Sequence, residues 1–284
     1  MKTILIKIGV LLVIVGLLAG LVISFFQAQQ RIDSQLEVYF LDFSNEDAIL
    51  VRYNDHAVLI DTAEEKHKQE LSSRLYRLGI ERLDALILTH PDKDHIGGAS
   101  AILEQFTVDT VLRSPFQKDS EQEKALIAAL ALSNAQDTIP DRPVHLDWGD
   151  VTLDIYPPGA SKEISSNESS LITVLQHGEI RMVLAGDAQE NRLAEMLNLP
   201  VAPCTLYKLP HHGRDSSLSV LAIETLQPPY VVVTAKETGP LVGQALVQTD
   251  AQVFFTAGRV VRASSNGQAL SMTYLNWDKP VGKG

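Results

Sequence analysis

Several features that would place a protein in a familiar class are missing from this chain of 284 residues. Cys204 is the only cysteine, so no intrachain disulfide can form and a cysteine-based metal cage is excluded. There is no Walker-type loop, and no glycine-rich dinucleotide fingerprint follows a strand-like run. No internal repeat or low-complexity segment is found. Any chemistry of this chain must therefore rest on residues other than thiolates or phosphate-binding glycine loops.

Positive charge is also scarce. The chain has 24 Lys plus Arg against 35 Asp plus Glu, which gives a formal net charge of −11. The overall field of such a protein does not attract anions, so a phosphate-bearing substrate would have to be bound by local cations. Hydrophobic residues make up 45% of the chain and charged residues 21%, as in an average soluble globular protein. A disordered chain and a membrane protein of many helices are thereby excluded.

Residues 8–26 lack charge as well, and this mostly apolar run is preceded by Lys2 and Lys7. A helix of that length covers about 28 Å, close to the roughly 30 Å hydrocarbon core of a bilayer. We predict that residues 1–30 are an N-terminal membrane anchor with one transmembrane helix, and that residues 31–284 form a soluble domain. Because positive residues favour the cytoplasmic side, the domain would be extracytoplasmic. The alternatives are a signal peptide and a buried soluble helix.

Strand-like and helix-like segments alternate in two rounds after residue 31, without a convincing linker. This pattern predicts one layered α/β domain rather than two domains. The expected strands, which are short apolar runs bounded by turn residues, are residues 36–43, 48–53, 57–61, 83–89, 108–113, 143–146, 151–156, 171–176, 181–185, 205–209, 230–235, 252–256, 260–263 and 270–274. The expected helices are residues 66–78, 99–105, 121–132, 188–197, 217–226 and 241–248.

The most informative segment is His90-Pro91-Asp92-Lys93-Asp94-His95, which directly follows an expected strand. Two imidazoles and two carboxylates so close together are costly to desolvate unless a cation joins them. A divalent metal ion, or a pair of them, is the simplest such cation. The alternative is a solvated polar turn whose histidines are incidental.

Two further segments have the same form, an apolar run followed by residues of the metal-ligand type. Residues 182–185 lead into Gly186-Asp187, and residues 206–210 lead into His211-His212-Gly213. Taken alone, a Gly-Asp pair is a common turn. The ends of strands in one layer can converge, however, so the three segments together predict one metal site.

In this order, the motifs resemble those of the metallo-β-lactamase superfamily. Its first motif is His-x-His-x-Asp-His, and here Asp92 replaces the second His. That variant is similar to the extracytoplasmic hydrolase domain of the DNA-uptake protein ComEC and its stand-alone relatives. The resemblance implies a four-layer αββα sandwich and a metal-dependent hydrolase. Further matching segments are Phe40-Leu41-Asp42, Asp47-Ala48-Ile49-Leu50, Leu59-Ile60-Asp61-Thr62, Asn167 with Ser170-Leu171, and Leu209 to Gly213.

The sequence departs from the family pattern at two places. The usual Gly-Gln-Gly-Asp opening is Ser44-Asn45-Glu46-Asp47, so its tight turn is expected to differ, and Ala63 stands where the family usually has Gly. Neither position is expected to bind metal. The multi-helix channel of the DNA-uptake protein is also absent, and one spanning segment cannot form a DNA pore, so the transport role is not carried over.

The resemblance also implies roles for the residues of the site. His90 and Asp92 would hold one divalent ion, and Asp94 and His95 a second. Asp187 would bridge the two ions, and His212 would complete the second site. Asp94 and His211 are the candidate catalytic residues, with His211 as an acid or a substrate contact. The third ligand of the first ion has no clear match, although Asn167 or Ser170 falls near its place.

These roles predict a membrane-tethered hydrolase that uses two zinc or manganese ions to activate a water, which attacks a phosphodiester. Nucleic acid is one candidate substrate, and Lys93, Lys208 and Arg214 are candidate cations for its phosphates. One alternative is an esterase or lactonase-type hydrolase of a small molecule or cell-wall component. The other is a binding domain whose metal site is degenerate.

Overall fold

The computed structural model of the chain describes residues 15–21, 35–159 and 164–275. Residues 15–21 are helical, but most of the predicted span over residues 8–26 lies outside the described residues. The predicted boundary between residues 30 and 31 lies outside them as well. Within the described ranges, every helix is too short or too polar to cross a bilayer. Residues 36–284 form a compact unit separate from residues 1–35.

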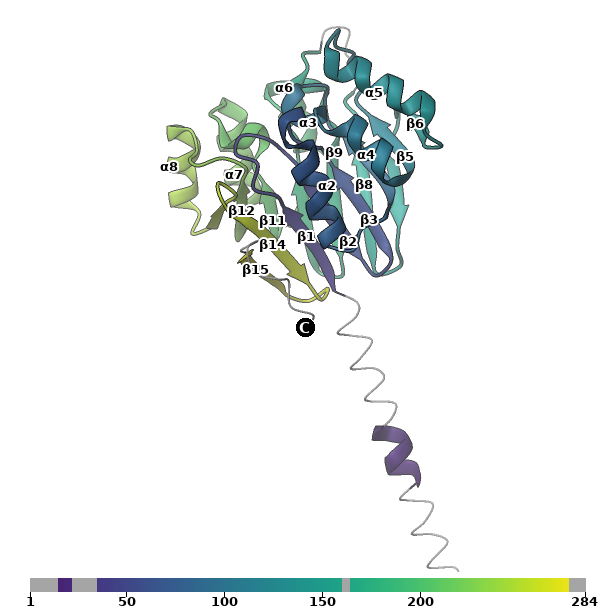
Figure 1. Cartoon of the computed structure of the whole chain (residues 1–284). Coiled ribbons are helices and arrows are strands. Elements are labelled where there is room, and N and C mark those ends of the chain that lie inside the picture. The colour runs from purple at the N-terminus through teal and green to yellow at the C-terminus, as the bar shows by residue number, and fades with distance from the viewer. Residues whose placement is uncertain (1–14, 22–34, 160–163, 276–284) are drawn as a thin grey trace, which may run out of the picture. The chain divides into compact units, whose positions relative to one another are not determined.

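Two mixed β-sheets form the body of this unit (Figure 1). The strands of the first sheet are β1 (Leu36–Phe40), β2 (Ile49–Tyr53), β3 (His56–Ile60), β4 (Arg82–Leu88), β5 (Thr107–Arg113), β6 (Gln136–Thr138), β14 (Val260–Ser265) and β15 (Leu270–Leu275). They lie in the order β15-β14-β1-β2-β3-β4-β5-β6. The strands of the second sheet are β7 (Val144–Asp147), β8 (Val151–Tyr156), β9 (Ile172–His177), β10 (Ile180–Leu184), β11 (Leu206–Lys208), β12 (Tyr230–Val233) and β13 (Gln252–Phe255). Their order is β13-β12-β11-β10-β9-β8-β7.

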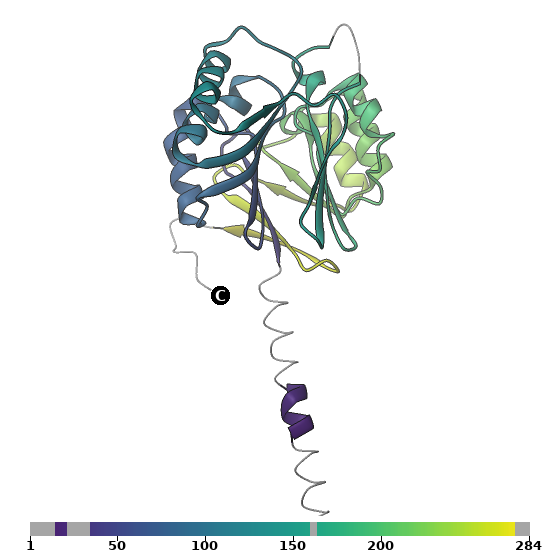
Figure 2. The same cartoon turned by 90° about the vertical axis from the view of Figure 1, so that its right-hand side faces the viewer.

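Helices cover the outer face of each sheet, which Figure 2 shows edge-on. The helices on the first sheet are α2 (Lys68–Arg77), α3 (Lys93–Ile96), α4 (Ala99–Gln105) and α5 (Glu121–Leu132). The helices on the second sheet are α6 (Glu190–Met196), α7 (Ser217–Leu226) and α8 (Pro240–Gln248). Three separate apolar clusters fill the spaces between the layers, one between the sheets and one beneath each helical layer. The predicted four-layer αββα sandwich is confirmed.

Each predicted strand and helix from residue 36 onward is present, with ends shifted by a few residues. The sequence did not reveal β6, whose three residues are polar and mostly exposed, because such a strand has no apolar alternation. It also did not reveal the short α3, or the 3-10 turns η1 (Glu65–His67), η2 (Asn167–Ser169) and η3 (Pro210–Gly213). Two of these, α3 and η3, carry predicted ligands.

The sheet topology gathers strand ends at one edge of the sandwich. In the first sheet β3, β4, β5 and β6 are parallel, and in the second β10, β11, β12 and β13 are parallel. The carboxyl ends of parallel strands share an edge, which is where open α/β sheets place their ligands. The Leu171 N–H donates to the Thr89 carbonyl at 2.9 Å, so the two sheets meet there.

Two glycines allow close approaches of the chain near this edge. Gly186 has a φ of +54°, and a Cβ on it would lie 3.0 Å from the Thr89 Cβ and 3.1 Å from the Ser170 Oγ. A Cβ on Gly97 would collide with the backbone nitrogen of Glu65. Glycine is therefore required at both positions, one beside Asp187 and the other directly after α3.

The two departures from the family pattern occupy left-handed backbone. Asn45 has a φ of +58° and the buried Ala63 a φ of +57°. Asparagine tolerates this conformation, whereas alanine adopts it at a cost of about 1–2 kcal/mol. The opening turn therefore keeps positive φ at Asn45, and Ala63 holds a conformation that glycine adopts freely.

Candidate metal centre

Each of the three predicted ligand segments follows the carboxyl end of a parallel strand. His90 comes two residues after β4, Asp187 three residues after β10, and His212 four residues after β11. All six predicted ligands meet at this edge, and we call them the histidine–aspartate cluster: His90, Asp92, Asp94, His95, Asp187 and His212. Asp92 and Asp94 have side chains 28% and 27% exposed, whereas the other four members are buried. The two carboxylates therefore form the open side of the cluster.

Four members form a tight group. The Nε2 atom of His95 lies 3.4 Å from Oδ1 of Asp187, and Nε2 of His212 lies 3.4 Å from Oδ2 of the same carboxylate. Nε2 of His212 is also 3.4 Å from Oδ2 of Asp94. One ligand atom from each of these four residues lies within 4.8 Å of the others, a spacing that a single metal ion could bridge. These are the residues predicted for the second ion.

His90 and Asp92 lie beside this group, and the ring centroids of His90 and His95 are 4.0 Å apart. Nε2 of His90 is 4.0 Å from Oδ2 of Asp187 and 3.9 Å from Oδ2 of Asp92. Asp187 thus offers one oxygen to His95 and the other to His90 and His212. Its central position is the one expected of a bridging carboxylate between two ions.

The cluster contains polar atoms that no group in the described part of the chain satisfies. Nε2 of His90, His95 and His212, and Oδ1 of Asp187, are fully buried and form no hydrogen bond. A buried polar atom without a partner costs about 1–3 kcal/mol, so four at one point need a common ligand. Imidazole nitrogens and carboxylate oxygens are the donors that zinc and manganese accept. The residues present therefore fit a divalent metal centre.

The opposite nitrogen of each imidazole is held by a neighbouring side chain. Nδ1 of His95 lies 2.7 Å from Oδ2 of Asp61, which also accepts the Thr89 hydroxyl at 2.7 Å. Nδ1 of His90 lies 3.1 Å from Oγ1 of Thr89. If these Nδ1 atoms carry the proton, the Nε2 lone pairs point into the cluster, as metal ligation requires. Asp61 appeared in the sequence only as part of a matching strand, and its positioning role became visible in the structure.

Electrostatics within the cluster also favour bound cations. Burial alone would lower the pKa of His95, but the Asp187 and Asp61 carboxylates raise it well above its usual value. Burial opposes protonation of His212 too, yet Asp187 and Asp47 contribute to raising its pKa to about 10. The imidazoles thus attract protons when no metal competes, because carboxylates outnumber buried cations here.

The pKa values of His90 and Asp94 are lowered rather than raised. Burial and the neighbouring His95 lower the pKa of His90 to about 3, so this imidazole is neutral. Burial would raise the pKa of Asp94, but the nearby imidazoles of His212 and His95 lower it to about 2. A neutral imidazole and an ionised carboxylate are the protonation states that bind metal.

A buried ion pair lies beneath the cluster. The Lys208 Nζ donates to Oδ2 of Asp47 and, at 3.2 Å, to the Gly186 carbonyl, and both charged side chains are almost fully buried. Oδ1 of Asp47 lies 3.4 Å from Nδ1 of His212, which Oγ1 of Thr234 also contacts at 3.0 Å. The expectation that Lys208 contacts substrate is therefore wrong, because its ammonium is enclosed and paired. The sequence pointed to Asp47 because it belongs to the opening motif of the family. It did not show that the partner of Asp47 is Lys208, which lies 161 residues away in the chain.

His211 lies beside the cluster and is not one of its members. Both His211 and His212 have left-handed backbone, with φ of 48° and 54°, which turns the two side chains in different directions. Nδ1 of His211 lies 2.7 Å from the Gln189 side-chain amide, and its Nε2 lies 3.0 Å from an Arg214 guanidinium nitrogen. The Gln189 amide nitrogen and the Arg214 guanidinium both only donate, whereas a neutral imidazole accepts at one nitrogen only, so these two contacts do not assign the proton of His211.

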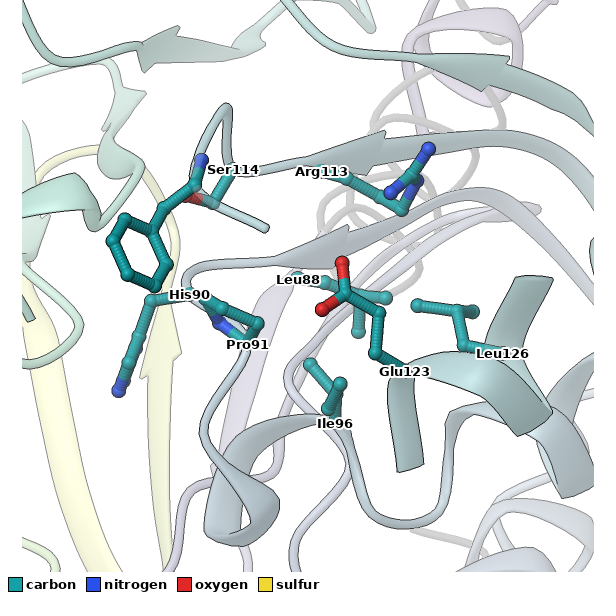
Figure 3. Close-up of a pocket in the computed structure, with 9 residues that line it drawn as sticks. Leu88, His90, Pro91, Ile96, Arg113, Ser114, Glu123 and Leu126 are labelled. Carbon is teal, nitrogen blue, oxygen red and sulfur yellow. The ribbon is translucent and has the colours of Figure 1, made fainter. Parts of the chain in front are cut away.

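A fourth basic residue, Lys118, was not found by sequence reasoning. Its Nζ lies 2.7 Å from Oδ1 of Asp92, which also accepts the Ser166 hydroxyl at 2.7 Å. The loop that carries it is tied down because the Lys118 N–H donates to the buried Glu123 carboxylate. Figure 3 shows this carboxylate on α5 pointing into a small pocket behind His90. Lys118 therefore orients Asp92 from a fixed loop.

The predicted position of the missing third ligand is occupied by polar groups with other partners. The Ser170 hydroxyl accepts the Asp187 N–H at 3.2 Å, and the Asn167 amide donates to Oε1 of Gln189 at 3.2 Å. In the described ranges, both residues position neighbours of the cluster. The third protein ligand beside His90 and Asp92 thus has no candidate here except the shared Asp187.

A four-layer αββα sandwich with clustered histidines and aspartates at the ends of its parallel strands defines a metal-dependent hydrolase fold. Residues 41–235 match the family model of the metallo-beta-lactamase superfamily. The chain belongs to this superfamily and is a metal-dependent hydrolase of it. The resemblance seen in the motifs is confirmed.

Comparison with individual proteins agrees with this family assignment. The chain is 30% identical over 224 residues to ComE operon protein 3 of Bacillus subtilis (strain 168), and the match covers 72% of this chain but only 29% of that protein. The solved structure of the metallo-beta-lactamase fold protein YhfI from Bacillus subtilis has a TM-score of 0.54 at 14% identity, and covers 81% of this chain and 100% of its own. Tm1679, a metal-dependent hydrolase of the beta-lactamase superfamily, has a TM-score of 0.53 at 15% identity, with coverages of 79% and 98%. At these identities the two structures show the fold alone.

Proposed function

We propose that this chain is a two-metal phosphodiesterase whose metal ligands are the six members of the histidine–aspartate cluster. The observation that carries the proposal is the convergence of three unpartnered buried imidazole nitrogens on the two oxygens of Asp187. Four ligand atoms suit a single ion. The six side chains of the cluster offer enough donors for a pair of ions that share Asp187.

The balance of charge supports two ions rather than one. The cluster contributes three carboxylates, and the adjoining Asp47 and Asp61 contribute two more, while Lys208 is the buried cation at its base. Lys118 pairs with Asp92 at the open side, so three negative charges are left, one more than a single divalent ion would offset. One ion would leave uncompensated charge in a largely buried site, a costly arrangement.

Bound as a pair, two divalent ions lower the pKa of a water toward neutrality and stabilise negative charge on the group that is attacked. The residues of this chain do the positioning. Asp61 and Thr89 fix the imidazoles of His95 and His90, and Lys118 fixes Asp92. Asp92 and Asp94 line the open side, from which a substrate can enter. Asp94 would act there as a ligand on the substrate side.

The mixed donor set suits either zinc or manganese. Three imidazoles favour zinc, whereas three carboxylates favour the harder manganese ion. The Asp92 in place of a histidine shifts the set toward oxygen ligands. Manganese is accordingly the ion we propose for the His90–Asp92 side, with zinc as the competing occupant.

Both the metal site and the sequence resemblance favour a phosphodiester as the substrate. Paired metal ions can stabilise both the attacking and the leaving oxygen of a phosphodiester. The motifs resemble those of a DNA-uptake protein, which makes nucleic acid the first candidate. The alternative substrate, a neutral ester or lactone, would need no cation beyond the metal pair.

The purified full chain is expected to contain about two divalent ions by elemental analysis and to hydrolyse bis-p-nitrophenyl phosphate when Mn²⁺ or Zn²⁺ is supplied. Chelation should remove activity, and added metal should restore it. Single-stranded DNA, RNA, a β-lactam and p-nitrophenyl acetate are tested in parallel. Turnover of the neutral ester alone would favour the esterase alternative, and absence of both metal and turnover would overturn the proposal.

We further propose that the chain is anchored in a membrane through residues 8–26 and that its hydrolase domain is extracytoplasmic. The support is the uncharged run of those residues with Lys2 and Lys7 before it. An anchored hydrolase would act on substrates outside the cytoplasm.

An alkaline phosphatase reporter fused after Gly284 tests this topology in a bacterial host. The fusion is expected to fractionate with membranes and to be active, because the reporter folds only outside the cytoplasm. Deletion of residues 1–30 serves as the control and should abolish both properties. An intact fusion that is inactive, or that remains in the soluble fraction, would contradict the proposal.

A further inference from the structure

Arg214 differs from the other basic residues around the histidine–aspartate cluster because no carboxylate neutralises it. Lys93, Lys118 and Lys208 each form an ion pair with an acidic side chain. In residues 35–159 and 164–275, no ion pair involves Arg214, although its side chain is exposed. Its guanidinium contacts Nε2 of His211 at 3.0 Å. Because its charge is not paired with a carboxylate, the Arg214 guanidinium can bind an anion that enters from solvent.

The backbone fixes Arg214 relative to the cluster. Its N–H donates to the His211 carbonyl at 3.0 Å, and the adjoining Gly213 carbonyl accepts the Gly239 N–H at 2.8 Å. Gly213 has a φ of +80°, and a Cβ on it would lie 3.0 Å from Cγ1 of Val233 in β12. The segment is therefore packed against a strand of the second sheet and holds the base of the Arg214 side chain in place.

His211 connects Arg214 to the cluster. The ring centroid of His211 lies 6.2 Å from that of His212, and an Arg214 guanidinium nitrogen lies 3.0 Å from Nε2 of His211. His211 is itself held by Gln189, which Asn167 contacts in turn. The guanidinium is thus the outer end of a chain of polar contacts that starts at the loop before β9. His211 contacts one nitrogen of the guanidinium, and the rest of this fork faces solvent.

We propose that Arg214 binds an anionic oxygen of the substrate and is the residue that selects anionic over neutral esters. This inference rests on the proposed hydrolase function and deepens it by naming the charge that the substrate carries. A guanidinium is permanently charged and presents paired donors that match a phosphate or a carboxylate. The net charge of −11 makes such a local cation necessary, since the field of the whole chain repels anions.

Arg214→Ala tests the inference in the full chain loaded with metal. Loss of charge-assisted hydrogen bonds should raise KM for bis-p-nitrophenyl phosphate about 10–100-fold with little change in kcat. KM for neutral p-nitrophenyl acetate should stay unchanged, and the carboxylate-bearing p-nitrophenyl hemisuccinate separates a general preference for anions from one for phosphoryl groups. Added guanidinium ion should partly rescue the variant, and Arg214→Lys should keep part of the effect.

The control is Arg82→Ala, which removes another exposed arginine, at the start of β4 and away from the strand ends that carry the cluster. Calorimetry with inorganic phosphate gives a readout that does not depend on turnover, and phosphate should bind more weakly to Arg214→Ala than to Arg82→Ala. Equal phosphate affinity, or an equal change in KM for charged and neutral esters, overturns the inference. If the parent chain hydrolyses no phosphodiester, the proposed function fails, and phosphate binding still decides the role of Arg214.

Discussion

Asp187→Asn is expected to abolish hydrolysis and to reduce bound metal below two ions per chain. Removal of a side chain that only orients a metal ligand lowers metal affinity or activity about 10–100-fold. Removal of a ligand shared by both ions should lower them further. Asparagine keeps the size of the side chain and leaves the backbone N–H that donates to Ser170, but it loses the negative charge that both halves of the cluster share. The measurements are kcat/KM on a phosphodiester and elemental analysis of the purified variant.

The fold should survive this substitution. Without metal, the substitution removes the Asp187 charge that faces His95 and His212, but both imidazoles keep another carboxylate neighbour, so none is left as an unpaired buried charge. Thermal unfolding in the presence of a chelator should therefore remain cooperative, with only a modest decrease of the midpoint relative to the parent chain. Asp119→Asn is the matched control, because its side chain is 89% exposed and lies outside the cluster. Full activity with two bound ions in Asp187→Asn would show that Asp187 is not a bridging ligand.

Lys208→Met is expected to destabilise the fold by about 3–5 kcal/mol, the usual cost of removing one partner of a buried ion pair. Burial would raise the pKa of Asp47, but Lys208 and His212 lower it, so the carboxylate is charged in the parent chain. Methionine has a similar length and leaves that charge enclosed without its ammonium. Equilibrium unfolding in urea with a chelator present measures the loss separately from any change in metal affinity.

The double variant Asp47→Asn with Lys208→Met provides the decisive comparison. Because it removes both charges, it should be more stable than Lys208→Met alone. Arg82→Met is the control for an exposed ion pair, since Arg82 and its partner Asp109 have side chains 64% and 37% exposed, and its unfolding midpoint should hardly change. If the single and double variants lose equal stability, the two side chains do not act as a pair.

The sequence predicted the candidate ligand residues, but not the side chains that hold them in place. The ligand segments could be recognised because each follows an apolar run, which marks a strand end, and because their residue types are those of metal ligands. Local patterns also predicted the strands and most helices. The 3-10 turn η3 was not predicted, because left-handed backbone at His211 and His212 contradicts ordinary residue preferences and persists only when the surrounding structure imposes it.

The partners of the ligands needed the structure. Lys208 looked like a cation for substrate and is instead enclosed with Asp47, and Lys118 had no sequence signal although it contacts Asp92. These pairs join residues far apart in the chain. No local pattern encodes such a contact, because it depends on how two sheets pack.

By itself, the sequence determined the alternation of strands and helices, the apolar faces that form the layers, and the kinds of side chain available for ligation. These properties follow from periodicity and chemistry over a few residues. Only the tertiary structure decided which nitrogens face the centre, which cations are already paired and that three imidazoles converge on Asp187. The physical reason is that burial and charge compensation are properties of the folded surroundings, and residues distant in the chain create them.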